Sequence, residues 1–441
     1  MLPVTGTETG VRPLGPAALE PLRVVQLNTW DRAGGAARVA QRLAEGLRAH
    51  GHDARVLAGF GDPKPDGATA AVLSTWPQWK RMLRRGTLAA EDISGLQYLL
   101  SWWSSEVASH PWMCDAQLVH LHNLHGGYAS QTMLPALSHR MPVVWTLHDM
   151  WALTGHCAYA VGCERWREGC GRCPDLRAYP DLWHDQTRRL WQGKRQLYAR
   201  SRLSLVTPSR WLAGLVQASP LLGQHPVVHI PNGVDLTVFH PQVGQTARRS
   251  LGLPESERLV LFVGEYLDDA RKGADLLAVS LARLQALGEA VTLVTVGQRD
   301  HAITWPQGIR RLALGPINDE ARLAALYGAA DLLACPSRLE NLPNTVLEAA
   351  ACGIPTVAYA VGGMAELVRH DDTGCLAQPF DTSEFAEGMR RLLTDEPLRQ
   401  RLGRHARELV EREYGIREHV ERHVALYREL LERDTCSGST A

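Results

Sequence analysis

Two glutamates, Glu340 and Glu348, stand eight positions apart in a segment with an unusual order of residue types. The apolar residues 332–334 predict a buried strand, and residues 345–351, stopped by Gly353, predict a short helix. We therefore expect Glu340 on a strand-to-helix loop and Glu348 about one turn into the helix. Carboxylates beside a helix N-terminus can organise a polar ligand whose anionic part binds the free amides. In isolation, such a pair is more often structural than functional.

Composition places the chain among ordinary globular proteins. Its 441 residues predict two or three domains, and 45% of them are hydrophobic. The 47 basic and 47 acidic residues cancel, so no global charge indicates a nucleic-acid partner. No run approaches 18 apolar residues, so no transmembrane helix is expected.

Both ends of the chain are predicted to be disordered. Residues 1–22 are rich in Gly, Pro and Thr and lack the apolar segment of a signal peptide, so they are interpreted as a leader without fixed structure. Residues 435–441 are interpreted as a disordered tail. From the lack of a secretion signal we expect a cytoplasmic protein with reduced cysteines.

The first half of the chain alternates between strand and helix patterns. An apolar strand at 23–28 is followed by Gly34 and Gly35, a helix at 36–49 and a strand at 54–58. A strand, glycine loop, helix and strand in this order begin a doubly wound parallel sheet. Further strands are predicted at residues 118–122, 142–147 and 204–208.

The pattern restarts after a tight turn at residues 231–235. Strands are predicted at 259–264, 291–297, 311–314, 331–334 and 356–359, with helices at 274–287 and 319–329 between them. The fold class is therefore α/β, with two Rossmann-like domains, 23–230 and 231–416, facing a cleft in which a ligand would bind. A final amphipathic helix is predicted at 417–434.

Several short motifs then combine into one pattern. They are Asn28 with Gly34 and Gly35, Thr146–Asp149, Pro231–Asp235, Arg271–Gly273, the Glu340–Glu348 segment, and Gly362–Gly363 with Glu366. Together they resemble glycosyltransferase family 4, whose members are retaining, metal-independent, nucleotide-sugar-dependent enzymes of the GT-B fold. The resemblance implies an acceptor domain at 23–230, a donor domain at 231–416 and a last helix that crosses back to the first domain. It implies no cofactor for catalysis.

The resemblance assigns the phosphate contacts to a basic pair. Lys272 matches the lysine that binds the pyrophosphate of the donor, and it stands before Gly273 at the predicted start of a helix. Without a metal, the charge on the leaving diphosphate must be stabilised by cations and helix N-termini. Many family members carry an arginine where this chain has Glu265. We expect Arg271 to take that place, because its planar fork fits phosphate oxygens.

The remaining donor contacts follow from the same resemblance. Glu348 is expected to bind the ribose hydroxyls, and Glu340 to contact the sugar or stabilise positive charge at its anomeric carbon. The backbone amides of Leu342, Asn344 and Thr345 are expected to hold sugar hydroxyls and the proximal phosphate. The absence of side chains at Gly34 and Gly35 permits their loop to approach the phosphates and the acceptor closely.

Histidines gather at the predicted strand ends of the first domain. His148 ends an apolar strand, where the carboxyl ends of parallel strands face a cleft, and by resemblance it approaches the transferred sugar as a catalytic residue. His120, His122 and His125 are interpreted as cleft lining that contacts the acceptor.

Four of the nine cysteines, Cys157, Cys163, Cys170 and Cys173, fall within seventeen residues of a loop at 155–175. Four thiolates can close a tetrahedron around zinc, and a Cys-x-x-Cys end is typical of structural zinc sites. Free thiols, a disulfide and an iron–sulfur cluster remain alternatives. Similar cysteine-bearing loops occur in polysaccharide-assembling members of the family.

The sequence thus predicts a retaining hexosyltransferase that uses a UDP- or GDP-linked sugar. The acceptor would be a saccharide or lipid-linked saccharide of cell-surface polysaccharide or glycoconjugate synthesis. The alternatives are a non-catalytic nucleotide-sugar-binding or scaffold protein and another enzyme of the same fold, such as an epimerase. The segment Trp76–Arg85 interleaves tryptophan with four cations, which suits either an ordinary surface helix or peripheral contact with the inner face of a membrane.

Overall fold

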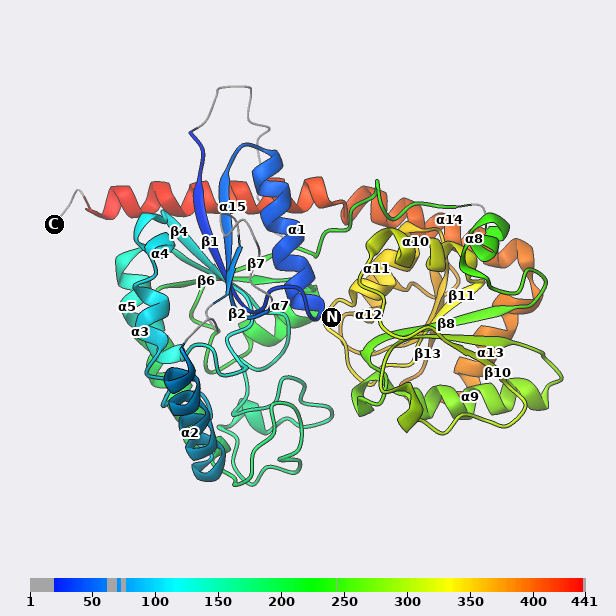
Figure 1. Cartoon of the computed structure of the whole chain (residues 1–441), viewed down its shortest axis with the longest axis horizontal. Coiled ribbons are helices and arrows are strands. Elements are labelled where there is room, and N and C mark those ends of the chain that lie inside the picture. The colour runs from blue at the N-terminus through cyan, green and yellow to red at the C-terminus, as the bar shows by residue number, and fades with distance from the viewer. Residues whose placement is uncertain (1–19, 62–69, 73–76, 243, 439–441) are drawn as a thin grey trace, which may run out of the picture.

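The computed structural model describes residues 20–61, 70–72, 77–242 and 244–438, with only the backbone placed for residues 436–438. It contains two parallel sheets, each covered by helices on both faces (Figure 1). The predicted leader, apart from its last three residues, and the last three residues of the predicted tail lie outside the described residues.

The N-terminal sheet has seven parallel strands in the order β3-β2-β1-β4-β5-β6-β7. Their bounds are β1 Arg23–Trp30, β2 Asp53–Phe60, β3 Ala70–Val72, β4 Leu118–Leu121, β5 Val143–Thr146, β6 Leu203–Thr207 and β7 Val227–His229. Val25 and Leu27 of β1 enter one hydrophobic core, and Val24 enters another on the opposite face. Burial on both faces explains why these strands read as continuous apolar runs.

The C-terminal sheet has six parallel strands in the order β10-β9-β8-β11-β12-β13. Their bounds are β8 Leu259–Tyr266, β9 Thr292–Gln298, β10 Arg310–Ala313, β11 Leu332–Cys335, β12 Thr356–Tyr359 and β13 Gly374–Ala377. Leu259 and Leu261 face one core, whereas Val260 and Phe262 face the other. The predicted α/β class with two Rossmann-like domains is confirmed.

Helices connect the strands of both sheets. In the N-terminal half they are α1 Gly35–Ala49, α2 Gln78–Ser94, α3 Ser104–Ala108, α4 Pro111–Asp115, α5 Leu134–Arg140, α6 Thr187–Ala199 and α7 Arg210–Gln217. In the C-terminal half they are α8 Gly244–Leu251, α9 Ala274–Ala286, α10 Glu320–Ala329, α11 Asn344–Ala351, α12 Met364–Leu367, α13 Thr382–Thr394, α14 Glu396–Glu413 and α15 Ile416–Gly438. Single 3-10 turns are η1 Gln131–Met133, η2 Arg165–Arg167, η3 Ala270–Lys272 and η4 Asp300–Ala302.

Two short strands, β3 and β13, have no counterpart in the sequence prediction. The strand β3 has three residues, and β13 begins with a glycine, so neither carries a local strand signal. Each gains its hydrogen-bonding partner only in the folded sheet, β3 from β2 and β13 from β12. Tertiary pairing therefore decides these two elements.

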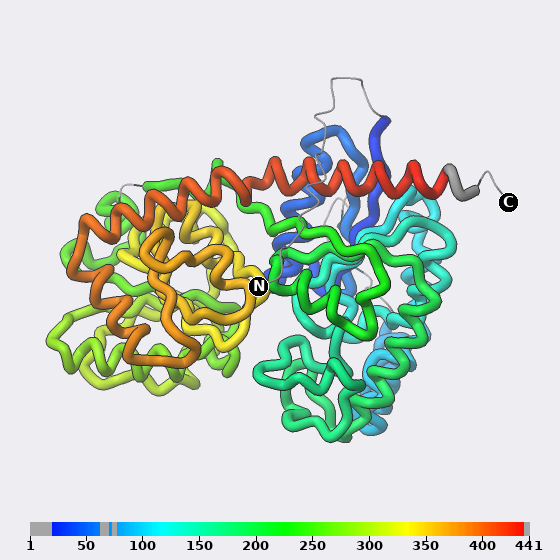
Figure 2. Tube along the Cα trace, turned by 180° about the vertical axis from the view of Figure 1, so that it is seen from behind, coloured from blue at the N-terminus to red at the C-terminus, as the bar shows by residue number. Residues whose placement is uncertain are grey.

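The last helix, α15, returns from the C-terminal domain and runs along the N-terminal domain (Figure 2). Its Val420 and Tyr427 are buried in one core with Leu43 and Leu47 of α1. The helix continues through Gly438, past the predicted end at 434 and into the predicted tail. Extension is favourable because each added residue of an existing helix gains one hydrogen bond.

The segment interpreted as a membrane-contacting or surface helix forms the start of α2, and Trp76 itself lies outside the described residues. Trp79, Met82 and Leu83 are exposed, whereas Lys80 pairs with Glu106 at 2.8 Å. Of the helices in the described ranges, none is both long and apolar enough to cross a bilayer. Contact with a membrane surface and a cytoplasmic location stay predictions.

Both sheets place their switch points at the domain boundary. In the N-terminal sheet the strand order reverses between β1 and β4, and in the C-terminal sheet between β8 and β11. Ligands of open α/β sheets bind outside the carboxyl ends of the strands at such points. The loops after β8 and β11 carry Lys272 and Glu340, so both residues lie at the edge where a ligand would bind.

Candidate active site between the two domains

The segment that carries Glu340 is a turn between β11 and α11. Asn232, from the turn that joins the domains, holds it by donating through Nδ2 to the Leu342 carbonyl at 3.3 Å and to Asn344 Oδ1 at 3.1 Å. The amides of Asn344 and Thr345 lie in the first turn of α11, where they have no acceptor within the helix. The turn therefore presents free amides close to Glu340.

Glu340 lies between two cations. Its Oε1 accepts from Arg271 Nη1 at 2.8 Å, from Lys272 Nζ at 2.7 Å and from Ser337 Oγ at 3.0 Å. Burial alone would raise the pKa of this carboxyl, but Arg271 and Lys272 lower the pKa of Glu340 to about 2. Asp269 also pairs with Arg271 at 3.4 Å, so two carboxylates balance the two cations as the site stands.

Two glycines permit this close assembly. Gly273 adopts a φ of 71° at the start of α9, and a Cβ there would lie 2.0 Å from the Pro336 carbonyl oxygen. Gly362 has a φ of 57°, and its Cβ would lie 1.9 Å from the Glu340 carbonyl oxygen. Any side chain at either position would displace the loop of Glu340 or the pair that binds it.

Glu348 is fully buried on α11, and the N-terminal domain supplies its partner. Arg42 of α1 donates to Glu348 Oε1 at 2.8 Å and to Glu320 Oε1 at 2.7 Å. Tyr327 donates its hydroxyl to Glu348 Oε2 at 3.2 Å, and Arg38 lies 3.8 Å from the carboxylate. In this structure an arginine of the opposite domain thus occupies the carboxylate predicted to bind ribose.

His148 lies at the domain boundary, half-buried at the end of β5. Asn341, directly after Glu340, donates to the carbonyl oxygens of Leu147 at 3.2 Å and of His148 at 3.1 Å. This amide ties the loop of Glu340 to the histidine across the cleft. Although Asp149 acts in the opposite direction, burial lowers the pKa of His148 to about 4, so its imidazole is neutral at neutral pH.

The interpretation of His120, His122 and His125 as cleft lining is wrong, because all three are buried. His120 contacts Tyr427 Oη of α15 at 2.6 Å, and His122 contacts His148 Nε2 at 2.9 Å. His125 lies 2.9 Å from Asp149. Their strands are covered by α15 and by the loop after β5, which sequence periodicity does not reveal.

Glu265 and the glycine pair face each other across the domain boundary. Gly34 has a φ of 86°, and a Cβ on it would lie 3.2 Å from Glu265 Oε2. Gly35 accepts a hydrogen bond through its carbonyl from Asn344 Nδ2 at 3.2 Å. The loop after β1 thus closely approaches the turn between β11 and α11, as the two glycines of that loop predict.

The cysteine-bearing loop also reaches the C-terminal domain. The guanidinium of Arg271 stacks 4.4 Å from the ring centroid of Tyr159, which lies between Cys157 and Cys163. A cation over an aromatic face is held in orientation by that ring. The loop therefore helps to orient an expected phosphate-binding residue.

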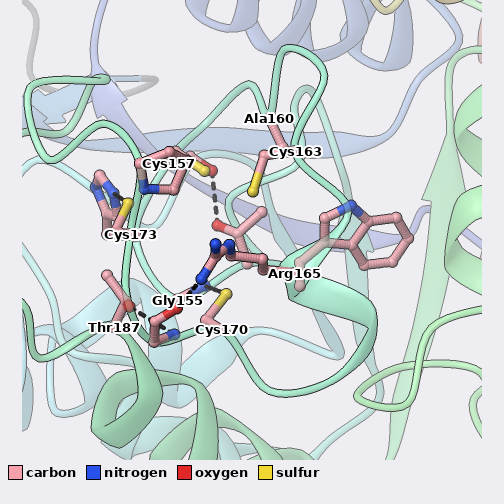
Figure 3. A pocket seen from close by; sticks show the side chains of 13 residues that line it. Gly155, Cys157, Ala160, Cys163, Arg165, Cys170, Cys173 and Thr187 are labelled. Carbon is pink, nitrogen blue, oxygen red and sulfur yellow. Dashed lines mark hydrogen bonds between the residues drawn. The ribbon is translucent and has the colours of Figure 1, made fainter.

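The four cysteines of the loop line a single small pocket (Figure 3). Burial raises the pKa of Cys157 to about 12 and that of Cys170 to about 11, so both thiols are protonated as they stand. Across the described ranges, no three His, Cys, Asp or Glu side chains are grouped closely enough to hold a metal ion. The zinc assignment stays a prediction.

Comparison with known proteins agrees with this geometry. Residues 33–238 match the model of Glycosyltransferase Family 4, and residues 244–409 match that of Glycosyl transferases group 1. The chain therefore has the two-domain GT-B fold, and each domain is similar to one glycosyltransferase family. The resemblance found in the sequence is confirmed at that level, whereas the polysaccharide-assembling subtype is not.

Individual curated relatives are similar to part of the chain. A D-inositol 3-phosphate glycosyltransferase of Mycobacterium tuberculosis is 33% identical over 268 residues, which cover 57% of this chain and 51% of the relative. The chain thus spans about half the length of the curated relatives that it matches.

Solved structures share the fold over almost the whole chain. Sucrose-phosphate synthase from Thermosynechococcus elongatus has a TM-score of 0.68 at 22% identity and covers 93% of this chain and 100% of its own. HepE from Anabaena, in complex with UDP and glucose, has a TM-score of 0.64 at 19% identity. The match covers 93% of this chain and 100% of the HepE chain. At these identities the likeness establishes the fold alone.

Three residues of the site escaped the sequence prediction. No sequence pattern pointed to Asn341 or Tyr159, because their roles depend on contacts with the other domain. Arg42 did give one, since it lies on the buried side of α1 among Val39 and Leu43. A lone arginine in an apolar helix face predicts a buried anionic partner.

Proposed function

We propose that this chain is a retaining glycosyltransferase that moves a hexosyl group from a UDP- or GDP-linked sugar to a saccharide or lipid-linked saccharide. The observation that carries the proposal is the position of Glu340, held between Arg271 and Lys272 and tied through Asn341 to His148. A donor diphosphate would bind the two cations and the first amides of α11. Glu348 would bind the ribose.

The proposed chemistry depends on stabilising the leaving diphosphate without a metal. Lys272 and Arg271 would neutralise charge as the glycosidic oxygen departs. Glu340 would stabilise positive charge at the anomeric carbon, and His148 would hold the sugar. The acceptor would attack from the face that the diphosphate leaves, which retains the configuration.

The acceptor would bind to the N-terminal domain beside His148 and the cysteine-bearing loop. An acceptor in cell-surface polysaccharide or glycoconjugate synthesis is consistent with the loop subtype inferred from the sequence. The exposed Trp79, Met82 and Leu83 of α2, beside exposed Arg81 and Arg85, would suit a lipid-linked acceptor at an anionic membrane surface.

A donor screen tests the proposal directly. We expect one UDP- or GDP-sugar to be hydrolysed slowly without acceptor, and its nucleoside diphosphate to bind by calorimetry. Lys272→Ala should weaken that binding about 30-fold, since a charge-assisted hydrogen bond contributes about 1.5–3 kcal/mol. Arg390→Ala is the matched control, because Arg390 pairs with Glu387 on α13 and no contact among the described residues links it to the turn of Lys272.

The proposal is wrong if no nucleoside diphosphate binds, or if Lys272→Ala and Arg390→Ala have equal effects. Binding without turnover of any donor, over a broad acceptor set, would instead favour the non-catalytic alternative. An inverted anomeric product would contradict retention alone.

Freeing Glu348 from Arg42 is expected to strengthen nucleotide binding. If Glu348 serves the ribose, the nucleotide must displace the 2.8 Å contact with Arg42. Arg42→Met should therefore lower the dissociation constant about tenfold, measured by calorimetry. Glu320→Gln is the control, because it alters the other partner of Arg42 and leaves Glu348 paired. Weaker binding by Arg42→Met would mean that Arg42 itself contacts the donor.

A further inference from the structure

The pocket lined by the four cysteines has a volume of about 20 Å³. This is roughly the space of one small bound species, since a water needs about 10–15 Å³ measured in the same way. Figure 3 shows Cys157, Cys163, Cys170 and Cys173 surrounding it from separate turns of the loop. Four sulfurs around one site of this size match the donor set of structural zinc.

Polar groups already contact two of the sulfurs. The amide of Gly155 donates to Cys170 Sγ at 3.2 Å, and His156 Nε2 lies 3.3 Å from Cys173 Sγ. The other ring nitrogen of His156, Nδ1, lies 2.9 Å from the Pro180 carbonyl oxygen, which fixes the ring. The Gly155 amide is a donor of the kind that supports a thiolate ligand, whereas neutral His156, whose Nδ1 donates to the carbonyl, accepts the Cys173 thiol proton through Nε2.

The backbone around the Cys-x-x-Cys end is strained. Cys170 has a φ of 54° and Arg172 a φ of 51°, although neither is glycine. Residues held in the left-handed region cost about 1–3 kcal/mol each and persist where the surroundings over-determine them. A metal bound to this turn would supply that constraint.

The most telling neighbour is Lys194 of α6, which is buried at 1% exposure. Its Nζ donates to the carbonyl oxygens of Trp151 and Thr154 and lies 3.6 Å from the Trp151 ring centroid. No carboxylate of the described ranges lies within 4.0 Å of this ammonium. Burial lowers the pKa of Lys194 to about 7, and the groups whose negative charge would raise it are Cys170, Cys157 and Asp149. A buried ammonium is unfavourable without a nearby anion, and two of these groups are thiols of the pocket.

We propose that Cys157, Cys163, Cys170 and Cys173 bind one structural zinc ion as four thiolates. Binding releases four protons to solvent and leaves a site of charge −2. Lys194 and Arg165, which lines the same pocket, offset that charge. The side chains must turn inward, because as they stand no three ligating groups of the described residues share one ion. The zinc would hold the loop that stacks Tyr159 on Arg271.

Metal analysis of the intact protein tests this without any variant. Protein purified without chelator should contain about one zinc per chain. Replacement by cobalt should give the sulfur-to-metal charge-transfer and visible bands of a tetrahedral four-thiolate site. Fewer than about half an equivalent of zinc after reconstitution, stoichiometric iron, or a disulfide between any two of the four cysteines would each overturn the proposal.

Variants then test the ligand set. Cys163→Ser and Cys170→Ser should each lower zinc affinity at least 100-fold in a chelator competition. Cys114→Ser is the matched control, because this cysteine is exposed and lies outside the loop, and it should retain full zinc. His156→Gln should also retain zinc, and loss of the ion there would overturn the four-thiolate assignment. Lys194→Met should lower zinc affinity about tenfold, and an unchanged affinity would overturn its assigned charge role.

Discussion

Glu340→Gln is expected to lower kcat by two to three orders of magnitude without weakening nucleotide binding. The glutamine keeps the shape of the side chain but removes its charge. Arg271 and Lys272 then lose the carboxylate that they now share at 2.8 and 2.7 Å. Lys272 becomes available to a diphosphate and Arg271 keeps only Asp269 as a carboxylate partner, whereas the positive charge developing on the sugar loses its stabiliser.

The informative measurement is therefore the split between turnover and binding. Steady-state kinetics with the donor found in the screen would give kcat, and calorimetry with its nucleoside diphosphate would give the dissociation constant. Asp275→Asn is the matched control, because Asp275 also pairs with an arginine, Arg338, yet does not contact the Glu340 cluster. An unchanged kcat would remove Glu340 from the chemistry. Equal losses in kcat and in binding affinity would mean that Glu340 only holds Arg271 and Lys272 in place.

Acidification below pH 6.5 is expected to destabilise the protein steeply. Five histidines have adjoining rings: His120 of β4, His122 and His148 from the loops after β4 and β5, and His419 and His423 of α15. Burial is the largest cause that lowers the pKa of each one. Neighbouring imidazoles add to it at all of them except His419, where Arg422 and Arg42 do so; for His148 and His419 the pKa falls to about 4. Asp149, Arg42 and Arg422 are the charged groups that act on them.

Proton linkage sets the direction in which the free energy of unfolding changes with pH. Below pH 6.5 the unfolded chain binds protons at these histidines, whereas the folded protein does not until about pH 4 or lower. Stability is therefore complete above pH 6.5 and is lost as the pH falls through this window. Each group contributes up to about 1.4 kcal/mol per pH unit once the unfolded imidazole is fully protonated, so the slope for five approaches about 7 kcal/mol per unit toward pH 5. Calorimetric unfolding between pH 7.5 and 5 would measure the slope.

One variant should flatten this slope. His423 is buried, and its Nε2 has no hydrogen-bond partner. His423→Leu would remove one proton-binding group and one unsatisfied polar atom, so we expect unchanged or higher stability at pH 7.5 and a slope lower by about a fifth. His301→Gln is the control, because His301 is exposed. Equal slopes for wild type and His423→Leu would contradict the buried histidines as the cause.

Local sequence signals were sufficient to predict most strands of both sheets. Strands such as β8 are apolar on both faces, and α11 is bounded by Pro343 and Gly353, so the signals are local and strong. The same holds for two short segments. A single strand-to-helix turn positions Glu340 and Glu348, and the start of a single helix positions Arg271–Gly273. These features follow from short-range chain geometry.

Only the tertiary structure decided what each of these residues contacts. Arg42 and Glu348 are 306 positions apart, and Asn341 and His148 are 193 apart. The histidines predicted to line the cleft are buried because α15, from the far end of the chain, packs over them. Periodicity reports which side of an element is apolar, but it does not report which distant element covers that side. The sequence by itself therefore determined the α/β class and the turns that carry the predicted site residues, whereas folding determined how these residues pair across the domain boundary.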